Sequence, residues 1–215
     1  RFFLARSRIA NEAGGVFDLQ DTGGLVPSTG GGQFDNTGGT LRSSGGNAAA
    51  INVAVNNDGG SFDGTNGTLR LAAGGIHSNT LTTSGAPVEF AGGTHAFSPG
   101  ASIAGDVRLT AGTLDVTHNP TLNGTLDWVS GNIAGTPNSG ATGGRLNVTS
   151  AGNVTFAGSA NRTLVDATID NEGAFNVDTV SSRLFLARAD IDNRGVFDLA
   201  STGGVVPSTG GGNVN

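Results

Sequence analysis

The sequence predicts an all-β fold, a single-stranded parallel β-solenoid in which short coils stack on one another. Three observations predict it: short segments alternate apolar and polar residues, these segments recur at a nearly fixed spacing, and glycines stand at their ends. Alternation with a period of two is typical of a strand with one buried face. A spacing of about 20 residues is too short for a propeller blade and leaves no helical stretch for a leucine-rich repeat. We therefore expect about nine to ten coils of roughly 20 residues and essentially no helix.

The most regular segments follow the pattern Gly-x-Φ-x-Φ, where Φ is apolar. Their first apolar positions are evenly spaced and predict one buried core column: Leu69, Val88, Val107 and Leu126. Their second apolar positions predict a neighbouring column: Leu71, Phe90, Leu109 and Trp128. A second inward strand, following each of these segments, is indicated by Ile76, Leu114, Val116 and Ile133. Glycines just ahead of these residues supply the positive φ angles that sharp corners require.

The least regular region is residues 30–60, where we expect a distorted coil. Two similar stretches contain Pro-Ser-Thr-Gly-Gly-Gly, at residues 23–32 and 203–212. We expect both to be loops that bulge from a coil.

A second, much longer repeat joins the two ends of the chain. Residues 1–33 are equivalent to residues 183–213: Arg1 aligns with Arg183 and, after a small gap, Gly15 aligns with Gly195. We interpret residues 1–215 as one continuous solenoid that contains one tandem repeat of about 181 residues and the start of the next. The coil of residues 1–19 should superpose on that of residues 183–199 after a shift along the axis.

Asparagines recur at one kind of corner. The tripeptide Ile-x-Asn ends at Asn11, Asn171 and Asn193. Asparagine side chains stacked on successive coils can bond to one another along the axis. We expect these three residues to belong to an asparagine ladder.

Four charged residues stand between the paired apolar positions and should form one outward column: Arg70, Glu89, Arg108 and Asp127. Their signs alternate, which favours a solvated ladder that maintains register. The alternative is an acid–base or metal site. However, the aspartates nearby are too scattered to hold calcium, and the chain has no Lys or Tyr. We expect no catalytic residue, cofactor or metal, and we expect His77, His95 and His118 to be surface or corner residues.

The composition restricts partners and location. The chain contains no Cys, and its net charge of −6 disfavours nucleic acid as a partner. No segment is apolar enough for a transmembrane span. Absence of Cys is compatible with an oxidising extracellular space.

The Gly-x-Φ-x-Φ strands, the Ile-Asp-Asn-x-Gly corners and the long, nearly identical repeats together resemble the right-handed parallel β-helix stalks of bacterial surface proteins. Filamentous-haemagglutinin-type adhesins and autotransporter passenger domains are members of that group. The resemblance implies a right-handed solenoid that is secreted or located at the cell surface.

The leading functional hypothesis is a structural repeat module of a long extracellular fibre, stalk or surface filament. Its partners would be adjacent repeats end to end, or other filaments side by side. The alternative is an adhesin that binds a glycan or a host surface through its lateral face or bulged loops. A polysaccharide lyase is the third hypothesis, and a non-enzymatic protein is expected.

Overall fold

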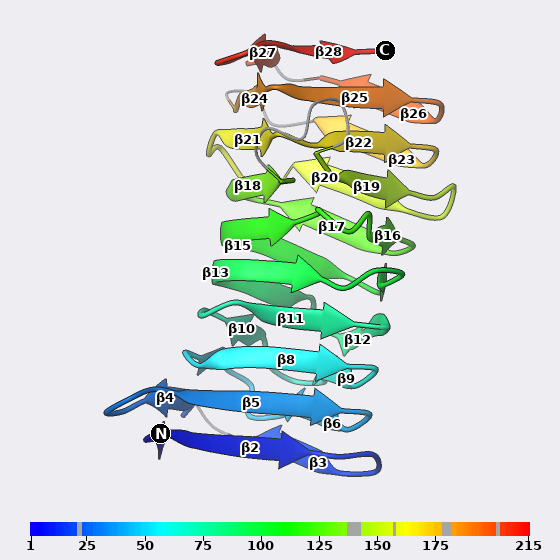
Figure 1. Cartoon of the computed structure of the whole chain (residues 1–215). Helices are drawn as coiled ribbons and strands as arrows, with labels where there is room; N and C mark the ends of the chain where they lie inside the picture. The colour runs from blue at the N-terminus through cyan, green and yellow to red at the C-terminus, as the bar shows by residue number, and fades with distance from the viewer. Residues whose placement is uncertain (21–22, 137–142, 157, 178–181, 201–202) are drawn as a thin grey trace.

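The computed structural model describes residues 1–20, 23–136, 143–156, 158–177, 182–200 and 203–215. Within these residues the chain forms strands β1 to β28 and no helix. The strands wind into a parallel β-solenoid of about nine turns with about 22 residues per turn. Figure 1 shows the coils stacked in chain order, with the two termini at opposite ends.

Each turn contributes one strand segment to each of three ladders, here called faces 1, 2 and 3. Face 1 consists of β1 (Phe2–Leu4), β4 (Leu25–Pro27), β7 (Ala49–Ile51), β10 (Leu69–Leu71), the first halves of β13 (Val88–Phe97) and β15 (Val107–Asp115), β17 (Thr125–Trp128), β20 (Asn153–Phe156), β23 (Ala174–Val177) and β26 (Val196–Leu199). Face 2 consists of β2 (Ser7–Asn11), β5 (Gly32–Thr37), β8 (Ala54–Asp58), β11 (Gly75–Ser78), the second halves of β13 and β15, β18 (Gly131–Ala134), β21 (Arg162–Val165), β24 (Leu184–Ala187) and β27 (Val205–Pro207).

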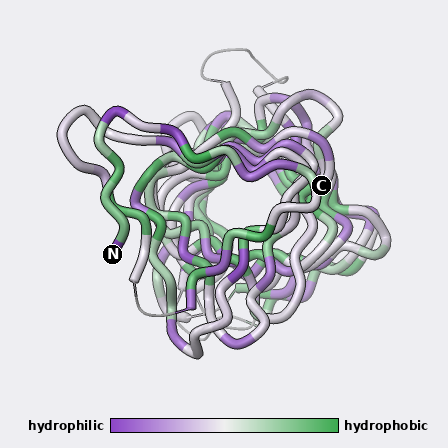
Figure 2. Tube along the Cα trace, turned by 90° about the horizontal axis from the view of Figure 1, so that it is seen from below, coloured by the Kyte–Doolittle hydropathy of each residue, from purple (hydrophilic) through white to green (hydrophobic). Residues whose placement is uncertain are grey.

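Face 3 completes each turn, and each of its strands pairs with the face 3 strands of the neighbouring coils. It consists of β3 (Val16–Leu19), β6 (Thr40–Ser43), β9 (Ser61–Gly64), β12 (Thr80–Gly85), β14 (Ser102–Ala104), β16 (Thr121–Leu122), β19 (Arg145–Val148), β22 (Thr168–Asn171), β25 (Ala189–Asn193) and β28 (Gly212–Val214). Because each strand pairs with its counterparts on the neighbouring coils, all backbone ladders run along the axis. Seen along that axis, the coils form a ring around a common centre, and loops of several coils extend outward from it (Figure 2).

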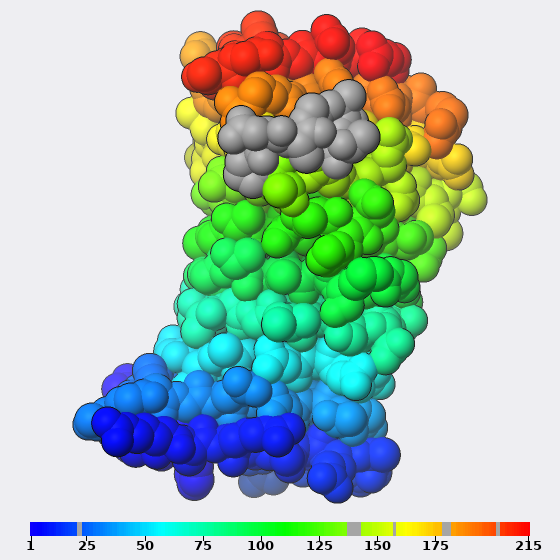
Figure 3. Space-filling view, viewed as in Figure 1, coloured from blue at the N-terminus to red at the C-terminus, as the bar shows by residue number. Residues whose placement is uncertain are grey.

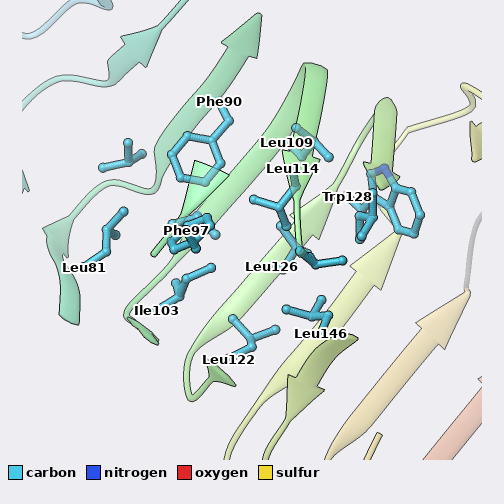
Figure 4. Close-up of a cluster of buried hydrophobic side chains, with 14 of the residues drawn as sticks. Leu81, Phe90, Phe97, Ile103, Leu109, Leu114, Leu122, Leu126, Trp128 and Leu146 are labelled. Carbon is cyan, nitrogen blue, oxygen red and sulfur yellow. The ribbon is translucent and has the colours of Figure 1, made fainter. Parts of the chain in front are cut away.

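The core consists of the inward residues of the three faces. Val88 pairs with Val107, and Val107 pairs with Leu126, so these side chains lie one above another. All four members of the first predicted column and all four of the second are almost completely buried, including Trp128 at 0% exposure. Figure 4 shows Leu109, Leu114 and Leu126 among the apolar side chains that fill the middle of the solenoid. The two columns that the even spacing predicts are therefore neighbouring rows of one core.

Glycines shape the corner between faces 1 and 2. Gly93, Gly112 and Gly131 lie on successive coils with φ of 68°, 80° and 85°. A Cβ atom on Gly112 would lie 2.4 Å from the carbonyl oxygen of Gly93. Other residues would meet both the positive φ and this close approach with strain, which explains why glycine recurs here.

One detail of the sequence interpretation is wrong, and two are correct only in part. Ile76 does not point inward: it is 54% exposed, and its neighbour His77 is buried instead. Residues 30–60 are distorted only in part: β5 and β8 pair over five consecutive residues, whereas β7 pairs with β4 through Leu25 and Ile51 alone. The stretches at residues 23–32 and 203–212 are loops only in part, because each contains a strand of the coil, β4 or β27, and only the exposed turn that follows it lies outside the strands.

Candidate functional site

The charged column lies on face 1. Arg70 pairs with Glu89, Glu89 with Arg108, and Arg108 with Asp127 in the strand register. Arg70 Nε lies 2.8 Å from Glu89 Oε2, while Arg108 lies 3.8 Å from both Glu89 and Asp127. Glu89 has only 15% of its side chain exposed, against 46% and 41% for the two arginines that flank it. The structure thus brings the four predicted residues together as a continuous outward row with one carboxylate held between two cations.

The row ends in neutral residues. Asp127 accepts a hydrogen bond from the hydroxyl of Thr155 on the next coil, and Ala50 stands below Arg70. All charges in the row are therefore used in pairing along the axis. This arrangement can oppose a change in the register between coils. If the charge of one coil took the position of the charge on the next coil, like charges would lie together.

A second ion-pair network lies on face 3, which the sequence analysis did not identify. Arg145 lies 2.8 Å from Asp170 and 3.4 Å from Asp192. Arg194 also contacts Asp170 and lies 3.2 Å from Glu172. The signal was present, since Asp170 and Asp192 occupy the outward position of the two Ile-Asp-Asn tripeptides.

A shallow groove accompanies this network. Its lining includes Asn147, Thr149, Asp170, Glu172 and Arg194. It is open to solvent and presents amide, hydroxyl, carboxylate and guanidinium groups side by side. Among the residues that the structure describes, no group of three or more His, Cys, Asp or Glu side chains could hold a metal ion.

The asparagines form two ladders, where the sequence analysis expected one. Asn171 donates to Asn193 at 2.7 Å on face 3. Asn11 belongs to a different ladder on face 2, in which Asn11 donates to Asn36 and Asn36 to Asn57, both at 2.8 Å. Asn36 and Asn57 were missed, although Phe34-Asp-Asn36 and Val55-Asn-Asn57 also place an apolar residue two positions before the asparagine.

Each ladder also bonds the corner that follows its strand. Asn11 donates to the carbonyl of Thr40 and Asn36 to that of Ser61, while Asn171 donates to Val196. The amide groups therefore compensate backbone carbonyls of the next coil at the point where strands end.

His77 and His95 contradict their expected place on the surface. Both are completely buried, with His77 Nε2 lying 3.1 Å from His95 Nδ1. Their rings stack at 5.4 Å and are surrounded by Phe62, Phe90 and Phe97. His118 is exposed in a turn, as expected.

Burial changes the protonation of this pair. Loss of hydration, together with the nearby His95, lowers the pKa of His77 to about 3. Loss of hydration lowers the pKa of His95 to about 4, although nearby carbonyls of Leu71 and Gly92 oppose the effect. His77 Nδ1 and His95 Nε2 have no hydrogen-bond partner within the described part of the chain. The pair is thus neutral at pH 7 and is chemically a polar inclusion in the core.

Comparison with known proteins provides no family. No family model, no curated protein and no solved structure matches the chain. Among the described residues no helix is long and apolar enough to cross a membrane.

Proposed function

We propose that this chain is a structural repeat module of a long extracellular fibre, stalk or surface filament. The observation that carries the proposal is the stacking of about nine coils in chain order, in which each strand pairs with its counterparts on the neighbouring coils. Figure 3 shows the resulting stack of coils, which is taller than it is wide. Coils that contact only their neighbours can be added without limit, and stability then grows roughly in proportion to their number.

The side-chain interactions are also those of a mechanical element. The charged column, the two asparagine ladders and the core rows all connect one coil to the next. Force along the axis would have to break these contacts together with the backbone ladders of all three faces. Absence of Cys supports a location outside the cell, where free thiols would cross-link.

Single-molecule stretching tests the mechanical role. Handles attached at residues 1 and 215 would apply force along the axis. The proposal predicts a stiff response followed by cooperative loss of one or more coils at a time. Smooth extension at low force, as a disordered chain gives, would contradict it. Val107→Asp is the matched weakened variant, because it disrupts the core in the middle of the stack.

The polar side chains in the groove on face 3 favour a second candidate function, an adhesin that binds a glycan through its lateral face. Neighbouring carboxylate, amide and guanidinium groups such as Glu172, Asn147 and Arg194 can bond to sugar hydroxyls. A glycan array probed with the parent chain and with Glu172→Gln tests this function. Binding that the substitution weakens would support it, and an array without signal would leave the fibre as the only proposal.

A further inference from the structure

The two ends of the chain have the same local structure. Phe2 pairs with Leu25 on β1 and β4, and the equivalent Leu184 pairs with Val205 on β24 and β27. Ser7 pairs with Gly32, just as Ala189 pairs with Gly212. The residues of the turns that follow β4 and β27 are also the same in the two copies.

The agreement extends to the backbone of the corners. Arg6 and Arg188 both have positive φ, 47° and 51°. The amide of Arg6 donates to Gly31 at 2.6 Å, and that of Arg188 donates to Gly211 at 2.7 Å. Equivalent sequences therefore form equivalent corners, independently of their position in the stack.

Equivalent strands nevertheless lie on different faces. β1 belongs to face 1 and its equivalent β24 to face 2, whereas β2 belongs to face 2 and β25 to face 3. In the same way β3 lies on face 3 and β26 on face 1. The long repeat thus contains eight complete turns and one further face. The expected superposition by an axial shift alone is wrong, because a rotation by one face is also needed.

The start of the second copy of the long repeat, residues 183–215, shows which strands cover the lower edge of a repeat. β24, β25 and β26 rest on β21, β22 and β23, respectively. Leu184 is buried there, while its equivalent Phe2 is 58% exposed at the chain end. Arg188 holds Asp166 of the lower coil through two hydrogen bonds of 2.6 and 2.7 Å. The equivalent Arg6 has no ion pair within the described residues.

We propose that β1, β2 and β3 form the receiving edge of a joint between repeats, and that each repeat is turned by one face relative to the preceding one. The occupant of the edge is a segment like residues 162–177 of a preceding copy, whose counterpart of Asp166 would pair with Arg6. This inference rests on the proposed fibre function and adds how successive repeats are oriented within the fibre. Three repeats bring the faces back into phase.

The rotation distributes lateral features around the fibre. The charged column, on face 1 of one repeat, would lie on face 2 of the next and on face 3 of the third. Eight and one-third rungs at about 4.8 Å place these columns roughly 40 Å apart along the axis. A partner that recognises the column would meet it on every side of the fibre, and on any one side only once in three repeats.

A chain with residues 1–182 repeated three times ahead of residues 183–215 tests the joint. Because the protein contains no Cys, His118→Cys in each copy gives one exposed site per repeat for a maleimide-linked gold cluster. Electron cryo-microscopy should show one rod that lengthens by roughly 40 Å per added copy. The three gold clusters should occupy three different sides of the rod.

Two other outcomes are distinguishable. A continuous rod with all clusters on one side would overturn the rotation and leave the fibre standing. Separate globules joined by flexible chain would overturn both. A control that lacks residues 88–106 in every copy removes one complete coil, so its clusters should move closer by one rung and keep their rotation.

The occupancy of the edge has its own matched test. In the same three-copy chain, Phe2→Asp in the first copy should leave the melting temperature nearly unchanged, because that edge remains open. Phe2→Asp in the second copy should lower it by several degrees, because the residue is buried in the joint. Equal effects of the two substitutions would contradict an occupied joint.

Discussion

Gly75 lies in the same strand as the buried His77 and pairs with the buried His95. It occupies an inward position on face 2, between Val55 below and His95 above. A Cβ atom on Gly75 would lie 1.8 Å from the carbonyl oxygen of Val55, so only glycine fits at this position. Gly74 and Gly75 both have positive φ, 78° and 155°. After them, the inward and outward positions are exchanged relative to those that the apolar spacing predicts. Ile76 was therefore assigned inward, and His77 outward, from a sequence pattern that the glycine pair shifts by one residue.

The histidine pair predicts that the protein is less stable in acid. Both residues have a folded pKa of about 3 to 4, below the ordinary value of 6.5. The unfolded chain binds more protons between these values, so the stabilisation is present above pH 6.5 and is lost as the pH falls towards 3. At pH 4.5 the loss should be on the order of 2 kcal/mol per histidine.

Urea unfolding at pH 7 and pH 4.5 measures this loss. The double variant His77→Leu/His95→Leu should lose less stability between the two pH values than the parent. His118→Leu, in an exposed turn, should behave like the parent. Equal pH dependence in all three proteins would contradict the buried neutral pair.

Val107 tests the assignment of the core row. It is 1% exposed between Val88 and Leu126, so Val107→Asp would bury a charge that has no partner. We expect a loss of about 3 kcal/mol or more in the free energy of unfolding. His118→Asp is the exposed control and should change the free energy little. Equal melting temperatures of the two variants would show that the inward register is wrong.

At the scale of elements, the charged column affects register more than total stability. Exposed ion pairs contribute little, so Arg70→Ala or Asp127→Ala should cost less than about 1 kcal/mol. Glu89→Arg should cost roughly 1 kcal/mol more than Glu89→Gln, because it places three cations on adjacent rungs. Thermal melts at low and high salt measure this, and the difference should shrink as salt rises. A charge reversal without any dependence on salt would exclude the ladder.

How far the sequence predicts each element depends on the regularity of its coil. Leu69 to Leu126 could be aligned because every coil between them has the same length. The next coil is longer, since Trp128 pairs with Phe156, and spacing alone does not indicate where added residues leave the coil. The asparagine ladders were joined in error for a related reason, because Ile9-Ala-Asn11 and Ile191-Asp-Asn193 are alike in sequence but lie on different faces.

At the scale of the whole molecule, the lengths of the turns determine on which face the second copy of the long repeat begins. Local sequence determines each corner, as Arg6 and Arg188 show. The face on which a corner lies depends on the sum of all turns before it. Because coils differ in length, the sequence offset between the two copies does not reveal that the second copy begins one face further round. That rotation became visible only from the strand pairings.

Oxidative cross-linking can establish whether the parallel coils stack in the register described above, because the chain contains no Cys. Thr113 pairs with Asn132 on the next coil, and Asn132 pairs with Thr163 on the one after. Adjacent rungs are about 4.8 Å apart, within reach of a disulfide, and two rungs exceed the limit of about 7 Å. Thr113→Cys/Asn132→Cys should therefore cross-link rapidly and completely, while Thr113→Cys/Thr163→Cys should stay reduced. Cross-linking of the second pair in preference to the first would contradict the stack.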